Sequence, residues 1–294
     1  AGIVAQKGMA GLVAATILAG VILILMGVFK LGGLIKFIPY TIVTGFTSGI
    51  AVTIVIGQIK DFLGLEFKHA PIETMEKLKE GIDTIGTINA QALSVGLIAL
   101  AILIVWPKIN AKIPPSLIAV IVTIVLVKGL DMEVNTIGSL YEISNKLPVP
   151  SMPQFSLELI ESVLPDAFTI AVLAAIESLL SCVVSDGMIG DRHNPNVELI
   201  AQGAGNIASG IFGGIPATGA IARTAANVKN GGRTPIAGMV HSVVLLLILI
   251  VLMPYAALIP MPAIAAILFM VAYNMCGWRE FVTLLKTAPK SDIF

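Results

Sequence analysis

The chain has 294 residues, of which 56% are hydrophobic and 12% are charged, and its formal net charge is zero. Soluble domains carry about 25% charged residues, so this composition indicates an integral protein of the lipid bilayer. A neutral chain gives no electrostatic reason to bind nucleic acid. Cys182 and Cys276 stand in apolar runs, and their spacing fits neither a metal site nor a disulfide framework. No cofactor or metal is expected.

Hydrophobic runs predict an all-α protein that crosses the membrane several times. Crossing about 30 Å of hydrocarbon takes about 20 apolar residues in a helix, and the fourth and last runs are shorter than this. The region 196–230 is rich in glycine and is predicted to be less regular. The predicted spans are 9–29, 40–59, 89–106, 114–127, 164–184, 238–258 and 261–276.

The charges of the connectors predict which side of the membrane each span end faces. The connectors 30–36, 108–112 and 228–234 each carry two basic residues and no acid, whereas 60–89 and 128–163 carry more acids than bases. By the positive-inside rule, the first three connectors face the cytoplasm and the other two face outside. This assignment alternates consistently from one span to the next.

A weak internal echo links two of the predicted spans. Ile38-Pro39 opens the second span and Ile259-Pro260 opens the seventh, and the charge argument runs these spans in opposite directions. Two similar segments of opposite direction are what an inverted-topology repeat predicts. The alternative is that the two Ile-Pro dipeptides occur by chance.

The stretch 212–235, FGGIPATGAIARTAANVKNGGRTP, interrupts this apolar pattern. Two glycines and Pro216 cannot continue a helix, and Thr218 or Gly219 is predicted to cap a new helix over 219–229. That helix is about 16 Å long, half a bilayer, so its N-terminus is expected near the midplane. Unsatisfied N–H groups and the charge of Arg223 make this point a candidate anion site. The alternative is a kinked helix whose arginine extends to the inner surface.

Glu177 lies in the middle of the span 164–184. An acid there costs at least about 2.5 kcal/mol on insertion scales, so it is expected to face a cavity or a partner. With Ser178 and Ser181 it forms a polar stripe, and it is a candidate site for a coupled proton. The alternative is an ion pair between Glu177 and Arg223 that only locks two helices together. No catalytic constellation of side chains is present, so an enzyme is not expected.

Three segments together resemble the SulP anion permease family, in the family's own order. These are GFTSGIAVTIVIGQIKDFLGL (45–65), AAIESLLSCVVSDGM (174–188) and AQGAGNIASGIFGGIPATGAIARTAANV (201–228). The family includes bacterial sulfate, bicarbonate and dicarboxylate transporters and the animal anion exchangers with prestin. The resemblance therefore implies a secondary transporter of sulfate, bicarbonate or a C4-dicarboxylate, in a bacterial inner membrane.

The same resemblance implies a fold of 14 segments in a seven-plus-seven inverted repeat, with a helix broken at the midplane. A core domain (here 1–36 and 164–258) is expected to slide like an elevator against a gate domain (37–163 and 259–294). The chain is expected to be a fragment covering roughly segments 3–12, without segments 1, 2, 13, 14 and the cytoplasmic STAS domain. As a full-length protein it is expected to form a homodimer.

Site residues also follow from the resemblance. Arg223 matches a basic residue near the anion, and Glu177 falls where many members carry an acid that binds a proton or sodium. Glutamate rather than aspartate at 177, and no hydroxyl at Ile221, favour proton coupling or exchange over sodium. Two alternatives stay open: a nucleobase–cation symporter of the same architecture and an anion channel. The expected substrate-binding residues are Thr218, Gly219, Ala220, Ile221, Ala222 and Arg223, and the expected coupling or selectivity residues are Glu177, Ser178 and Ser181.

Overall fold

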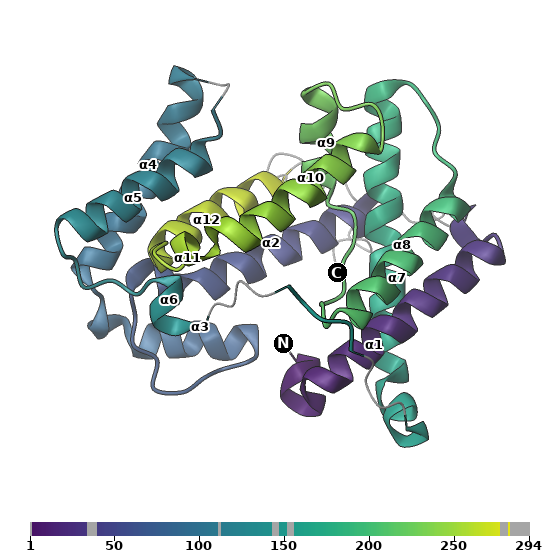
Figure 1. Ribbon diagram of the computed structural model, residues 1–294. Coiled ribbons are helices and arrows are strands. Elements are labelled where there is room, and N and C mark those ends of the chain that lie inside the picture. The colour runs from purple at the N-terminus through teal and green to yellow at the C-terminus, as the bar shows by residue number, and fades with distance from the viewer. Residues whose placement is uncertain are drawn as a thin grey trace. The chain divides into compact units, whose positions relative to one another are not determined.

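The computed structural model describes residues 2–33, 40–110, 113–142, 147–151, 156–276 and Val282. Within these ranges the regular elements are helices, and an isolated antiparallel bridge joins Thr136 to Pro260 (Figure 1). The predicted all-α fold is therefore confirmed. The helices are α1 (Gly2–Val28), α2 (Tyr40–Leu63), α3 (Thr74–Asp83), α4 (Ala90–Ile109), α5 (Pro115–Gly129), α6 (Ile137–Leu140), α7 (Leu157–Ile189), α8 (Pro195–Ile211), α9 (Ile221–Lys229), α10 (Ile236–Leu247), α11 (Met253–Ala256) and α12 (Met261–Cys276).

All seven predicted spans coincide with helices. In the described part of the chain, four helical segments are long and apolar enough to cross a membrane, namely α1, α4, α7 and the continuous segment Ile236–Ala256, while α5 and α12 are shorter apolar helices. The chain is thus an integral membrane protein. The Ile38-Pro39 half of the predicted internal echo lies outside the described residues.

The prediction of a less regular region over 196–230 is wrong for its first half, which forms α8. The glycines there serve helix packing. A Cβ added to Gly203 would lie 2.5 Å from the carbonyl oxygen of Gly20 in α1, and one added to Gly20 would lie 2.6 Å from the carbonyl oxygen of Gly203. Such close backbone approach needs residues without side chains, as at other membrane helix interfaces.

The chain forms two compact units. Which of them moves during any transport cycle is a question about motion, so the assignment of core and gate domains stays a prediction. The first unit comprises Ala1–Pro39 and Lys146–Val244, and the second comprises Tyr40–Asn145 and Leu245–Phe294.

In the first unit, α1 packs along both α7 and α8, and α9 packs on α7 (Figure 1). Small residues dominate the buried interface, because they let helix backbones come close. Near the start of α1, Gly8 has a φ of 67°, which interrupts the helix and favours glycine. Lys7, directly before this break, forms an ion pair with Asp166 of α7. The core consists of Ala14, Ala15, Ala19, Leu23, Val163, Ala167, Ala171, Ala174, Ala175, Leu179 and Leu199.

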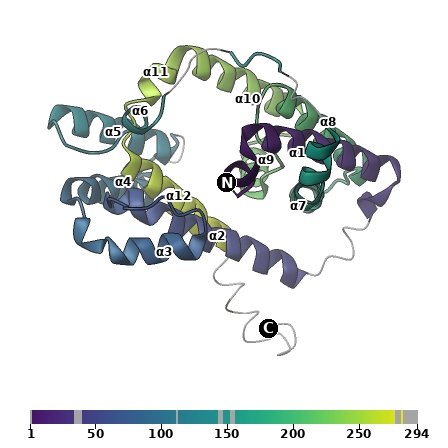
Figure 2. The same cartoon turned by 90° about the horizontal axis from the view of Figure 1, so that it is seen from below.

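In the second unit, α12 packs on α2 and α4, α4 packs on α5, and α3 lies along α2 (Figure 2). The rings of Phe62 and Phe269 meet inside it, with centroids 4.9 Å apart. The two connectors rich in acid contact each other at one end: Asn89 Nδ2 donates to the carbonyl oxygen of Glu133 at 3.0 Å, and Gln91 Oε1 accepts from the Glu133 N–H at 2.6 Å. Both connectors therefore lie at the same end of this unit, as the charge argument requires.

Candidate functional site

The segment between α8 and α9 runs without helix over residues 212–220, as the GGIP motif predicts. Its second residue, Gly213, has a φ of 71°. The side chain of Asn206, which is 1% exposed, holds it: Nδ2 donates to the Ala217 carbonyl and Oδ1 accepts from the Ala217 N–H, both at 2.9 Å. Ser209 donates to the Ile215 carbonyl at 2.9 Å. Side chains of α8 thus satisfy backbone groups that a non-helical segment would otherwise leave unpaired.

The helix that follows begins at Ile221, two residues later than the predicted start at residue 219. Its N-cap is Ala220, with no side-chain cap, and its first helical residue is Ile221. The prediction that Thr218 or Gly219 caps the helix is wrong, because the extended linker continues through both residues as far as Ala220. Thr218 Oγ1 donates instead to the carbonyl oxygen of Ala174 in α7, at 3.0 Å.

The first N–H groups of α9 are left available. The N–H of Arg223 bonds the Ala220 carbonyl at 3.0 Å. Within the described part of the chain, the N–H groups of Ala220, Ile221 and Ala222 have no partner. Such a helix start carries a partial positive charge of roughly half an electron charge and presents donors to an anion.

The start of α9 rests against the middle of α7. A Cβ added to Gly219 would lie 3.5 Å from both Ser178 Oγ and Ser181 Cβ. The Ser181 hydroxyl lies 2.6 Å from the Thr224 hydroxyl in the first turn of α9. The structure therefore brings the predicted Ser178 and Ser181 together with the predicted start of α9, and it adds Thr224, which the sequence reasoning missed.

The lengths of α7 and α9 show where along α7 the start of α9 lies. α7 has 33 residues, or about 50 Å, and exceeds the hydrocarbon thickness. α9 has nine residues, or about 14 Å, and ends at Lys229 in a connector rich in basic residues. Since Thr218 bonds Ala174, near the midpoint of α7, the start of α9 lies about half-way along the longer helix.

Glu177 and Arg223 are not paired in this structure. Glu177 is partly buried and Arg223 is exposed, and neither side chain makes a hydrogen bond or an ion pair with any other described residue. The structure therefore gives no support to the alternative of a locking ion pair. Both charges remain available to other partners.

A third acid near the site, Glu198 in the first turn of α8, was not singled out from the sequence. It accepts a hydrogen bond from the hydroxyl of Ser178. A signal for its position exists in Asn194-Pro195, since an N-cap residue followed by proline marks a helix start. The Asn194 side chain accepts from the N–H groups of Asn196 and Val197.

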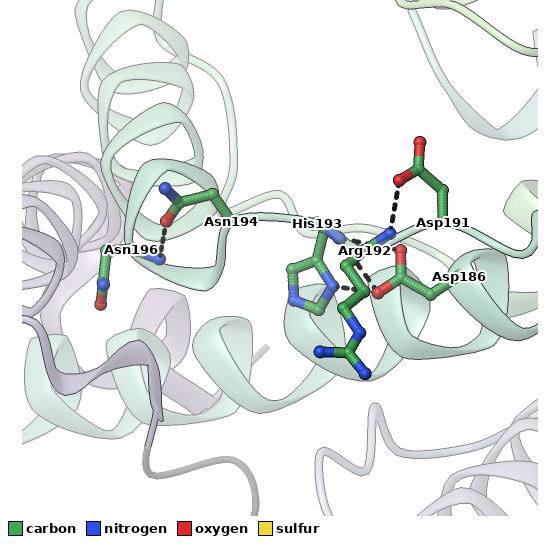
Figure 3. A network of polar contacts seen from close by, with 6 residues as sticks. All are labelled: Asp186, Asp191, Arg192, His193, Asn194 and Asn196. Atoms are coloured by element: carbon green, nitrogen blue, oxygen red, sulfur yellow. Dashed lines mark hydrogen bonds and ion pairs between the residues drawn. The ribbon is translucent and has the colours of Figure 1, made fainter.

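The short connector between α7 and α8 is held by its own polar contacts (Figure 3). Asp186 Oδ2 lies 2.7 Å from His193 Nδ1, and the same carboxylate accepts from the His193 N–H at 3.0 Å. These bonds fix the start of α8 against the end of α7, and so set the position of Glu198. Among the described residues, no group of three or more His, Cys, Asp or Glu side chains could hold a metal ion.

The sequence is similar to a family of known membrane transporters. A model of the sulfate permease family matches residues 3–294. The putative sulfate transporter YvdB of Bacillus subtilis is 43% identical over 97% of this chain and 54% of its own length. The bicarbonate transporter BicA of Picosynechococcus is 33% identical over 98% of this chain and 51% of its own. The chain thus spans about half the length of the curated relatives that it matches.

Solved structures give the same result for the fold. The transmembrane domain of a cyanobacterial bicarbonate transporter BicA superposes with a TM-score of 0.85 at 31% identity, covering 99% of this chain and 74% of that one. Murine Slc26a9, an anion transporter in the inward-facing state, superposes with a TM-score of 0.82 at 20% identity, covering 98% of this chain and 48% of that one. The second likeness concerns the fold alone.

Proposed function

Since the chain belongs to the sulfate permease family, we propose that the full-length protein is a secondary transporter of small anions. The substrate class is a small oxyanion or carboxylate: sulfate, bicarbonate or a C4-dicarboxylate. Relatives named as sulfate and bicarbonate transporters support this class. Bacterial relatives support a place in the plasma membrane.

One observation carries the proposal: the uncapped start of α9 lies against the middle of α7. The N–H groups of Ala220, Ile221 and Ala222, which have no partner among the described residues, supply donors. Gly219 lets the backbone pass close to α7, and Thr218 ties the linker to that helix. In this proposal an anion binds at the helix start, and unpaired Arg223 adds a full positive charge.

Glu177 is the proposed coupling group. It lies in the same stretch of α7 as Ser178, and it has no partner among the described residues. A carboxylate removed from bulk water tends to bind a proton, and protonation removes a negative charge close to the anion. Proton symport, or exchange, follows from this arrangement more directly than sodium coupling.

Movement and assembly complete the proposal. The unit that holds α1, α7, α8 and α9 contains the candidate site, and the proposed motion carries that unit as a rigid body past the other. The full-length protein is proposed to act as a homodimer. The nucleobase symporter is less well supported than an anion transporter, because the family match and the named relatives concern anions.

Uptake of labelled anions by the full-length protein in liposomes tests the proposal. Sulfate, bicarbonate and fumarate are compared with and without an inward proton gradient, beside Glu177→Gln. We expect saturable uptake of at least one anion, driven by the gradient and losing that drive in the variant. Uptake of nucleobases alone would favour the symporter alternative, and ion currents without saturation would favour a channel.

A further inference from the structure

An exposed apolar surface lies outside the predicted spans, in the connector 60–89. Five large apolar side chains there are exposed, with exposed fractions between 42% and 70%. The same connector carries more acids than bases and is predicted to face the outside. Contiguous apolar patches are uncommon on surfaces that face water, and they mark contact with a partner or a membrane. The five residues are Ile72, Met75, Ile82, Ile85 and Ile88.

Helical spacing gathers two of these side chains on one side of α3. Met75 and Ile82 are seven residues apart, which is two turns of a helix, so both project from the same flank. They are 70% and 62% exposed, and we call them the apolar flank of α3. Glu76 and Asp83 each follow one residue later and lie about 100° further round the helix. These two exposed acids form its polar flank.

The other sides of α3 are fixed to the second unit (Figure 2). Gly81 is buried against the end of α2, where an added Cβ would lie 3.8 Å from Ile59 Cγ2. The carboxylate of Glu80 accepts hydrogen bonds from the N–H groups of Lys68 and His69, at 2.9 and 3.2 Å. Thus α2 and the loop before α3 hold the helix in place, while its apolar flank stays exposed in the described part of the chain.

The contact with Ile59 places α3 at the edge of the membrane. Ile59 is the last residue of the predicted span 40–59, and two charged residues follow it. Val52 and Val55 lie on the same face of α2 as Ile59, since the three are spaced by three and four residues. Both valines are exposed, at 55% and 40%. The exposed apolar surface of α2 therefore leads directly to α3.

We propose that the apolar flank of α3 inserts into the outer leaflet of the membrane and anchors the second unit at the boundary between lipid and water. A helix with an apolar flank beside a charged one is typical of this boundary. Lys79 is exposed between the two flanks, so its ammonium can reach lipid phosphates while its stem lies on the apolar side. This inference does not rest on the anion site. It gives a fixed depth to the unit past which the other is proposed to move.

Nitroxide labels on α3 test this anchor in the full-length protein, reconstituted into vesicles of phosphatidylethanolamine and phosphatidylglycerol. Native cysteines, including Cys182 and Cys276, are first replaced by alanine. Power saturation in electron paramagnetic resonance then compares collisions of each label with oxygen, which concentrates in lipid, and with a water-soluble nickel chelate. All four labelled positions are exposed, so no label disturbs a buried contact. The single-cysteine variants are Met75→Cys and Ile82→Cys on the apolar flank, with Glu76→Cys and Asp83→Cys on the polar flank as matched controls.

We expect the ratio of oxygen to nickel collisions to be several-fold higher at positions 75 and 82 than at positions 76 and 83. Equal ratios at all four positions, with free access of the nickel chelate, would place the apolar flank in water and overturn the inference. Protection of positions 75 and 82 from both reagents would show that protein, such as a second copy of the chain, covers this flank, and would also overturn it. The test does not use anion uptake, so its failure leaves the proposed function standing.

Discussion

The hydroxyl groups of Ser181 and Thr224 lie 2.6 Å apart and join the middle of α7 to the first turn of α9. Ser181 is 4% exposed, so this contact is shielded from water. Together with the bond from Thr218 to Ala174, it holds the start of a short helix at a fixed place along a long one. Precise placement matters because helix-start donors act on a ligand only over a short distance.

Loss of this contact is expected to weaken anion binding. Thr224→Val keeps the shape of the side chain and removes the hydroxyl. A neutral hydrogen bond contributes about 1 kcal/mol, so we expect the dissociation constant to rise about fivefold. Ser242→Ala, whose hydroxyl bonds only its own helix at Gly238, is the control. Equal affinities of Thr224→Val and the wild type for sulfate in calorimetry would contradict this role.

The linker before α9 is expected to depend on Asn206. Asn206→Leu removes the two bonds to Ala217 and leaves the backbone groups of Ala217 without this partner. We expect the free energy of unfolding to fall by about 2–3 kcal/mol, with loss of anion binding. Thermal unfolding and sulfate titration measure the two effects. Asn230→Ala, at an exposed position that bonds only Ala226, is expected to change neither.

The close contact between α1 and α8 makes Gly203 sensitive to a single methyl group. Gly203→Ala places a Cβ 2.5 Å from a backbone oxygen, so the helices must separate, at a cost of about 1–3 kcal/mol. Gly205→Ala on the same helix meets nothing within 4 Å, and it is expected to raise stability by up to about 1 kcal/mol. If the unfolding midpoints of the two variants shifted in the same direction from that of the wild type, the packing at Gly203 would be looser than described.

Acid is expected to weaken the second unit through Glu80 of α3. Loss of hydration alone would raise the pKa of Glu80, but backbone N–H groups of His69 and Lys68 bond its carboxylate and hold the pKa below 4.5. A carboxyl with a lowered pKa stabilises the fold fully above 4.5, and this contribution is lost as pH falls through the folded pKa.

Comparison of Glu80→Gln with the wild type tests this sign. The difference in unfolding midpoint is expected to be present near pH 7 and to shrink as the pH drops below 4.5. Glu142→Gln, an exposed residue of the same unit, is the control. A difference that grows on acidification would mean that the carboxyl prefers its protonated form in the folded protein.

Hydropathy and turn chemistry were sufficient to predict the spans and the break at Gly213–Pro216, because both are local properties of the sequence. The helix α8 was missed, since glycine lowers helix propensity and only the contact with Gly20 shows why Gly203 is tolerated. The cap was placed at Thr218 or Gly219 because hydroxyl and glycine residues favour that position. The actual partner of Thr218, Ala174, lies 44 residues away.

The partners of the candidate site could not be read from spacing either. Glu198 meets Ser178 across 20 residues, and Thr224 meets Ser181 across 43. Such pairs depend on how α7, α8 and α9 pack, which periodicity does not specify. Glu177 and Arg223 were recognisable from composition alone, because a charge in an apolar run is conspicuous. Their lack of mutual contact is a result of the fold.

Binding of sulfate to the purified full-length protein, in wild type and in Arg223→Ala, tests the central claim most directly. Lys229→Ala, at the far end of α9, is the matched loss of one positive charge. A hydrogen bond to a charged group contributes about 1.5–3 kcal/mol, so the account predicts an affinity about 10- to 100-fold weaker in Arg223→Ala and little change in Lys229→Ala. Equal affinities in all three folded proteins would contradict an anion site at the start of α9.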